Sequence, residues 1–259
     1  MINVSEFLLE WPRPMQVLNI SSQASQRLAK SARIILSGSL TKLALCGTIS
    51  EIARVVALAT LQELTELEIV CRFNTAARRN KEESLIVLAP FINRFKNTLR
   101  SLTIYSSASV DHSAFFGVLW LRSLEKLSVR LYLFDKAHLS DPSGLGRLLT
   151  VNQSTLINLE FQVTAEGRLA KECPTSLIIL QRYIVNNARL ARLRSLSIPC
   201  FDFPTTLDMI RQASKTLKKI CLTRPGAMTP KELNEVAALF KGRTPVSVEF
   251  ATSDGIFLT

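Results

Sequence analysis

A short phrase of apolar and polar residues returns along the whole chain. Its pattern is L-x-x-L-x-(L/I/V/F), so that apolar residues recur three and then two positions apart. Clear copies begin at Leu40, Leu64, Leu99, Leu124, Leu156, Leu193 and Leu217, and weaker copies are "MQVLNI" from Met15 and "VSVEF" from Val246. The end of each copy alternates apolar and polar residues as a half-buried strand does. Each copy therefore predicts one short strand.

The spacing of the copies predicts a repeat architecture. From Met15 to Leu217, successive copies begin 24 or 25 residues apart in four intervals and 32, 35 or 37 residues apart in the other three. Stacked strand-and-helix repeats of the shortest kind are about 20–29 residues long, and the longer intervals leave room for extra helix or loop.

The segments between the copies carry apolar residues at helical spacing. Helices are expected over 24–35, after Ser50 as N-cap, and in "KEESLIVLAPFINRF", "PTSLIILQRYIVNNARL", "TTLDMIRQASKTL" and "TPKELNEVAALFKG". In the last of these, Thr229 and Glu232 have the spacing of a capping box around Pro230. Pro90 should kink or restart its helix. Strands that alternate with helices through right-handed crossovers predict a parallel sheet with helices outside.

The repeated phrase resembles the leucine-rich repeat family, in its ribonuclease-inhibitor-like form, over almost the whole chain. The resemblance implies an α/β fold, a curved solenoid (horseshoe) of about eight or nine repeats. Its parallel sheet would be concave and its helices would lie on the convex side. We expect one solenoid over residues 1–259, with 1–14 as an N-terminal cap or partial repeat and 243–259 as a C-terminal strand and cap. An ordinary α/β domain with leucine-rich strands is the alternative.

The polar residues between the core positions predict a binding face. In a strand these residues point away from the core, and in a solenoid they line the hollow. The candidate binding residues are Lys42, Glu66, Glu68, Thr103, Tyr105, Lys126, Arg130, Glu160, Gln162 and Lys219. Tyr105 and Arg130 are candidate anchors, because tyrosine and arginine often dominate binding energy at interfaces. A merely solvated strand face is the alternative.

Charge adds a second candidate surface. The chain has 32 Lys and Arg against 21 Asp and Glu, a net charge of +11, which favours acidic partners, whether protein, nucleic acid or phospholipid, and does not choose among them. The partner we expect is a protein with an acidic surface. Many cations fall just before a strand and should stack into a basic edge: Arg94, Lys96, Arg100, Arg122, Arg192, Arg194, Lys215 and Lys218. The alternative is that these cations only offset helix macrodipoles.

Catalytic signals are weak. Asp111, His112 and Ser113 are neighbours in sequence, but a triad is a matter of geometry. "SGLGR" at 143–147 has two glycines without a preceding strand, so it is interpreted as a loop that opens a short helix. Five widely spaced cysteines contain no C-x-x-C motif. We therefore predict a protein that is not an enzyme and has no catalytic, cofactor-binding or metal site.

The chain also lacks signals for a membrane or nucleic acid. No apolar run approaches the roughly 18 residues of a transmembrane helix, and the N-terminus does not resemble a secretory signal. With three tyrosines and two tryptophans, the chain has few such rings on which nucleic-acid bases could stack. A monomer in the cytoplasm is expected, with the nucleus as the second compartment.

The irregular repeats, with "NTLRSLTI" closing a helix such as "LAPFINRFK", are similar to those of fungal F-box leucine-rich-repeat proteins. In that family the F-box docks the ubiquitin-ligase core and the repeats hold the substrate. The resemblance implies a non-enzymatic protein-interaction scaffold, the substrate-recognition part of such a receptor or a fragment of one. Few residues precede Met15, so a ubiquitin-ligase adaptor is expected as a partner only if an F-box exists elsewhere.

Two alternatives stay open. One is a basic adaptor that binds an acidic protein or a ribonucleoprotein. The other is a regulator of a small GTPase, which would use an exposed residue in a loop after a strand, such as Arg72.

Overall fold

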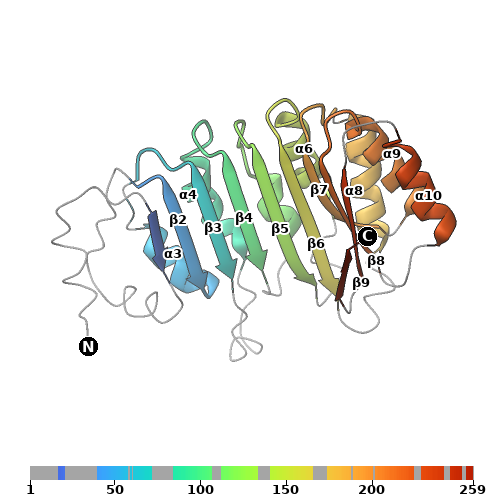
Figure 1. Cartoon of the computed structure of the whole chain (residues 1–259). Coiled ribbons are helices and arrows are strands. Elements are labelled where there is room, and N and C mark those ends of the chain that lie inside the picture. The colour runs from blue at the N-terminus through green and yellow to red at the C-terminus, as the bar shows by residue number, and fades with distance from the viewer. Residues whose placement is uncertain are drawn as a thin grey trace.

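The repeated phrases form one open sheet (Figure 1). The computed structural model describes residues 17–20, 40–57, 59, 61–71, 84–106, 112–133, 141–165, 174–187, 189–200, 202–224, 229–241, 246–252 and 255–258. The ten strands lie in sequence order: β1 (Val17–Ile20), β2 (Lys42–Gly47), β3 (Glu66–Cys71), β4 (Ser101–Ser106), β5 (Lys126–Leu133), β6 (Asn158–Ala165), β7 (Ser195–Pro199), β8 (Lys219–Arg224), β9 (Ser247–Thr252) and β10 (Gly255–Leu258). Strands β1 to β9 are parallel, as predicted, and β10 runs antiparallel to β9.

The phrase determines where each strand begins. Every strand from β1 to β8 starts two residues after the first apolar residue of its copy, as Lys42 follows Leu40. The second apolar residue of one copy pairs with the second apolar residue of the next, from Leu43 through Leu67 to Leu102 and onward to Ile220. Equivalent residues of successive repeats are therefore cross-strand neighbours.

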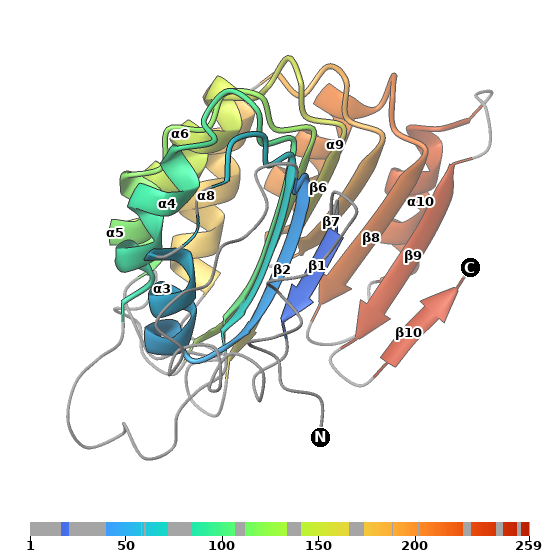
Figure 2. The same cartoon turned by 90° about the vertical axis from the view of Figure 1, so that its left-hand side faces the viewer.

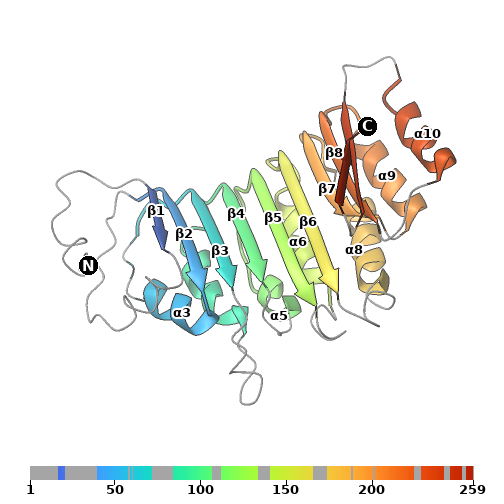
Figure 3. The same ribbon diagram turned by 60° about the horizontal axis from the view of Figure 1, so that its bottom comes forward.

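The helices cover one face of this sheet (Figure 2). They are α3 (Ile49–Ala57), the 3-10 helix η2 (Leu85–Leu88), α4 (Ala89–Asn93), α5 (His112–Gly117), α6 (Ser143–Val151), α8 (Pro174–Asn187), α9 (Phe203–Ala213) and α10 (Pro230–Ala238). The first leucines of the copies are all buried between sheet and helices: Leu40, Leu64, Leu99, Leu124, Leu156, Leu193 and Leu217. Figure 3 shows the sheet bending with the helices on the outside. This arrangement is consistent with a curved repeat solenoid.

Local signals account for most of the helix starts. Thr229 and Glu232 form the predicted capping box of α10 with Pro230 in the first turn, and Pro90 lies where α4 restarts after η2. The prediction of Ser50 as an N-cap is wrong. The backbone N–H of Glu51 donates to Thr48 Oγ1 at 3.3 Å and that of Thr48 donates to Glu51 Oε2 at 2.9 Å, so the cap lies two residues earlier.

The glycines of "SGLGR" serve packing. The segment opens α6, as the interpretation of a short helix requires. A Cβ atom on Gly144 would lie 2.5 Å from the backbone nitrogen of Gly117 in α5, so only glycine lets these two helices approach.

Several expectations fall outside the described residues, namely the cap at 1–14, the helix over 24–35 and part of the segment 243–259. That last segment contains the predicted strand as β9 and the antiparallel β10, which the phrase pattern did not predict. Within the described ranges, no helix combines the length and the apolar character needed to cross a bilayer.

Candidate functional site

The sheet face opposite the helices carries the predicted binding residues in rows. Register pairs Lys42 with Glu66, Glu68 with Thr103, and Tyr105 with Arg130. Continuing the same rows are Lys126, Glu160, Gln162 and Lys219. All ten candidates therefore lie on one surface, which we call the uncovered face.

A shallow hollow of about 160 Å³ lies on this face between β2 and β5. Its polar lining includes Lys42, Glu66, Glu68, Thr103 and Lys126. Lys42 and Glu66 form an ion pair at 2.7 Å across the first two strands of the hollow. Among the described residues, Glu68 and Lys126 have no such partner, so one acid and one cation remain available to a bound molecule.

The candidate anchors Tyr105 and Arg130 differ in their surroundings. Arg130 donates to Glu160 Oε1 from Nε at 3.0 Å and from Nη2 at 2.6 Å, while Ser128 donates to Glu160 Oε2 at 2.7 Å. The guanidinium group is thus already held within the protein. Tyr105, its cross-strand neighbour, leaves 42% of its surface exposed. Tyr105 is the better anchor of the two.

A third ion pair closes the far end of the face. Lys219 Nζ lies 2.8 Å from Glu249 Oε1, and this carboxylate, only 16% exposed, raises the pKa of Lys219 by hydrogen bonding and by its charge. Among side chains described on the uncovered face, the cations are Lys42, Lys126, Arg130 and Lys219 and the acids are Glu66, Glu68, Glu160 and Glu249. The face is therefore balanced in charge and does not itself select an acidic partner.

The eight cations of the predicted basic edge come shortly before strands. Because β1 to β9 are parallel, their first residues share one side of the sheet, here called the leading edge. All eight predicted edge residues are exposed there: Arg94, Lys96, Arg100, Arg122, Arg192, Arg194, Lys215 and Lys218. The macrodipole alternative applies to Arg94, which is the C-cap of α4, and to Lys215, which lies two residues beyond the end of α9. The other six lie three or more residues beyond the end of a described helix, where the effect has faded.

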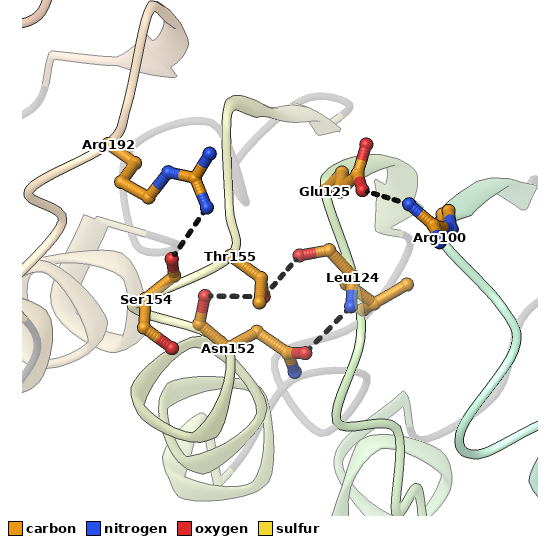
Figure 4. Close-up of polar contacts among 7 residues, drawn as sticks. All are labelled: Arg100, Leu124, Glu125, Asn152, Ser154, Thr155 and Arg192. Carbon is orange, nitrogen blue, oxygen red and sulfur yellow. Dashed lines mark hydrogen bonds and ion pairs between the residues drawn. The ribbon is translucent and has the colours of Figure 1, made fainter.

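Three of the edge cations are engaged by the protein. Arg94 donates to the carbonyl of Ala59 at 2.8 Å and lies over two phenylalanine rings. Arg100 pairs with Glu125 at 2.7 Å (Figure 4). Arg192 reaches the carbonyl of Ser154 at 3.5 Å. The side chains of the other five have no partner within the described parts of the chain.

The residue directly before each strand, the pre-strand position, joins the repeats at this edge. Its carbonyl accepts two backbone N–H groups from the next repeat: Glu125 and Lys126 donate to Arg100, and Lys218 and Lys219 donate to Arg194, all at 2.7–3.0 Å. Neighbouring pre-strand residues are thus held one strand spacing apart, about 4.8 Å.

Side chains that the sequence reasoning missed reinforce this joint. A threonine stands before the first leucine in "NTL", "STL" and "KTL", and each hydroxyl donates to the first-leucine carbonyl of the preceding repeat: Thr98 to Leu64 at 3.1 Å, Thr155 to Leu124 at 2.7 Å and Thr216 to Leu193 at 2.7 Å. The signal was present in the repeated phrase, one position outside the pattern considered.

Asn152 makes the most buried of these connections. It accepts from the Leu124 backbone N–H at 2.8 Å (Figure 4). It also donates to the carbonyls of Leu121 at 2.9 Å and Leu148 at 2.8 Å. Buried polar groups need such partners, so Asn152 ties the end of α6 to the loop that precedes β5.

The residues considered for catalysis are placed as follows. His112 and Ser113 are buried in the first turn of α5, and Ser113 Oγ accepts from the Asp141 backbone N–H at 2.9 Å. Asp111 and Arg72 lie outside the described residues. In the portion of the chain that the structure describes, no three His, Cys, Asp or Glu side chains gather in a way that could hold a metal ion.

Comparison with known proteins adds no relative. No protein-family model matches the chain, and neither a curated protein nor a solved structure matches it.

Proposed function

We propose that this chain is a non-enzymatic scaffold of the leucine-rich-repeat kind that recognises another protein on its uncovered face. The observation that carries the proposal is the face itself. Strands β2 to β9 present polar side chains in rows, with none of the described helices over them (Figure 2), around the exposed ring of Tyr105. A broad, gently hollowed surface with one aromatic anchor suits a protein surface better than a small molecule.

The register of the repeats supports the leucine-rich-repeat assignment. The phrase L-x-x-L-x-(L/I/V/F) coincides with a strand each time and its three apolar positions face the helices. Stacked repeats of this kind commonly bind partners on their concave surface. Within this proposal, the finer role is substrate recognition for a ubiquitin ligase of the F-box type, with a ligase adaptor as the second partner only if an F-box exists elsewhere.

The leading edge favours one alternative, a basic adaptor for an acidic protein or a ribonucleoprotein. Its exposed cations would contribute a sequence-independent attraction for polyanions that weakens steeply with salt. No observation favours the third role, regulation of a small GTPase.

Affinity purification from the native cell tests the proposal. The bait is the full chain, compared with Tyr105→Ala on the uncovered face and with Ile179→Ala, a matched control that removes a 50% exposed apolar side chain from the helical side. Lysates are treated with nuclease and washed at two salt concentrations, and captured proteins are quantified by mass spectrometry.

We expect captured proteins that survive nuclease and high salt, are depleted with Tyr105→Ala and are retained with Ile179→Ala. A ligase adaptor and cullin among them would support the F-box type of role. Capture that vanishes with nuclease or salt would favour the ribonucleoprotein alternative. Equal capture by both variants would overturn recognition through the uncovered face.

A further inference from the structure

The leading edge at β7 and β8 holds a cluster of unpaired positive charge. Arg192 and Arg194 precede β7, and Lys215 and Lys218 precede β8; all four are exposed. The only contact recorded for these four side chains within the described residues is the 3.5 Å hydrogen bond from Arg192 to the Ser154 carbonyl. We call these four residues the β7–β8 cluster.

Two members of the cluster are held side by side. Arg194 and Lys218 occupy the pre-strand position of adjacent repeats, and the backbone N–H of Lys218 donates to the Arg194 carbonyl at 2.8 Å. Like charges directly opposite each other on neighbouring strands are destabilising. The same position at β4 and β5 carries the ion pair of Arg100 and Glu125. The fold can therefore place an acid at this position. Lys218, next to Arg194, does not stabilise the fold as an acid there would.

Helix macrodipoles do not account for the cluster. The last turn of α8 contains no cation and α8 ends at Asn187, well before Arg192 and Arg194. Lys218 lies beyond the end of α9 at Ala213. The macrodipole effect is confined to about the last turn of a helix, so only Lys215 is close enough to gain from it.

Within the described ranges, no acidic side chain forms an ion pair with the cluster. The nearby acids Glu249 and Asp208 are paired with Lys219 and Arg211. On one side the cluster is bounded by the uncharged residues 153–157 before β6, and beyond them lies Glu125. On the other side Lys241, which comes before β9, is also exposed, so the positive charge has a clear boundary only at residues 153–157.

We propose that the β7–β8 cluster binds a short aspartate- and glutamate-rich segment of a protein partner. In an extended chain every second side chain points the same way, and such side chains are about 7 Å apart. Two carboxylates at this spacing can meet cations on two adjacent strands. A nucleic-acid strand tracking the edge would pass the uncharged stretch and the Glu125 carboxylate. This inference rests on the proposed role as a protein-recognition scaffold and adds a second contact outside the uncovered face.

The test measures binding of fluorescein-labelled hexaglutamate to the full chain by fluorescence anisotropy, with hexaglutamine as the neutral peptide. One double variant carries Arg194→Gln and Lys218→Gln, which remove two positive charges from the cluster. The matched control carries Lys96→Gln and Arg122→Gln and so removes the same charge. Lys96 and Arg122 are also exposed and are also joined by a backbone hydrogen bond, at 3.0 Å. We expect the first to weaken hexaglutamate binding about tenfold and the control less than about twofold.

The variant Lys218→Glu separates recognition from structure. It recreates at β7 and β8 the pairing seen between Arg100 and Glu125. We expect hexaglutamate binding to be lost while the melting temperature holds or rises. A fall in melting temperature together with the loss of binding would mean a structural role and would overturn the inference.

Three other outcomes would also overturn it: no binding of hexaglutamate, equal weakening by both double variants, or tighter binding of a single-stranded RNA oligonucleotide than of hexaglutamate. If hexaglutamate fails while capture of proteins through Tyr105 persists, only the inference falls. If capture through Tyr105 fails while hexaglutamate binds at the cluster, the uncovered-face proposal falls and the acidic-segment site stands.

Discussion

At β4–β5 and at β7–β8 the pre-strand position makes the same two backbone hydrogen bonds to the next repeat. The side chains at that position differ. Arg100 meets Glu125 at the first place, and Arg194 meets Lys218 at the second. Because these two hydrogen bonds use backbone atoms only, the side chain at the pre-strand position is free to vary. At β4–β5 the side chains form an internal ion pair, and at β7–β8 they are two exposed cations.

The uncovered face extends the same comparison. Its ion pairs Lys42–Glu66, Arg130–Glu160 and Lys219–Glu249 connect neighbouring strands, and the two charges of each pair neutralise one another. In this proposal, the leading edge therefore attracts a partner through its positive charge, and the uncovered face binds through its shape and the ring of Tyr105. Each surface can be tested without disturbing the other.

The largest effect is expected where the joint between repeats is buried. Asn152→Ala leaves the Leu124 N–H and the Leu121 carbonyl without the partner they have now. We expect the free energy of unfolding to fall by about 3 kcal/mol, since each unsatisfied buried group costs about 1–3 kcal/mol. Urea denaturation measures it.

Gln153→Ala is the control for Asn152. The Gln153 side chain accepts only an exposed hydrogen bond from the Arg189 N–H, so its loss should change the free energy of unfolding by less than about 0.5 kcal/mol. Equal losses from the two variants would contradict a structural role specific to Asn152.

The threonine hydroxyls should matter equally at both ends of the edge. Thr98→Val, Thr155→Val and Thr216→Val each remove one hydrogen bond between repeats while keeping a β-branched side chain. We expect each to lower the free energy of unfolding by about 1 kcal/mol. A loss at Thr98 and Thr155 with none at Thr216 would mean that the β7–β8 joint differs in its backbone as well as in its charges.

The smallest effects are expected from exchanging charges at the pre-strand position, and they have opposite signs. Glu125→Lys copies the β7–β8 arrangement at β4–β5 and should destabilise by a few tenths of a kcal/mol, while Lys218→Glu should stabilise by about the same amount. Thermal melts at low salt measure both shifts, and 1 M salt should shrink them because surface charges are screened. Shifts of the same sign would break the comparison.

The sequence was sufficient to predict the sheet because each strand is specified locally. Three apolar residues at fixed spacing place one face in the core, so Lys42 and Lys219 begin their strands at equivalent points of the phrase. The antiparallel β10 carries no copy of the phrase and was missed. Ser50 was mistaken for the N-cap because Thr48 and Glu51 form a capping box two residues earlier.

The candidate sites were predicted as positions but not as partners. Arg130 and Glu160 are distant in sequence, and only the register brings them to 2.6 Å. The same holds for Arg100 and Glu125, so the pattern alone could not separate cations engaged by the fold from those of the β7–β8 cluster.

Site-specific photo-crosslinking tests the central claim, recognition of a protein through the uncovered face. An aromatic photo-crosslinking amino acid, which keeps a ring at position 105, replaces Tyr105 in one sample and Ile179 in the other; the two residues are exposed at 42–50% but on opposite sides of the sheet. The chains are irradiated in native cells, and adducts are resolved by gel and mass spectrometry. The account predicts a discrete protein adduct at position 105 and none at position 179. An adduct only at position 179, or no adduct at position 105, would contradict it.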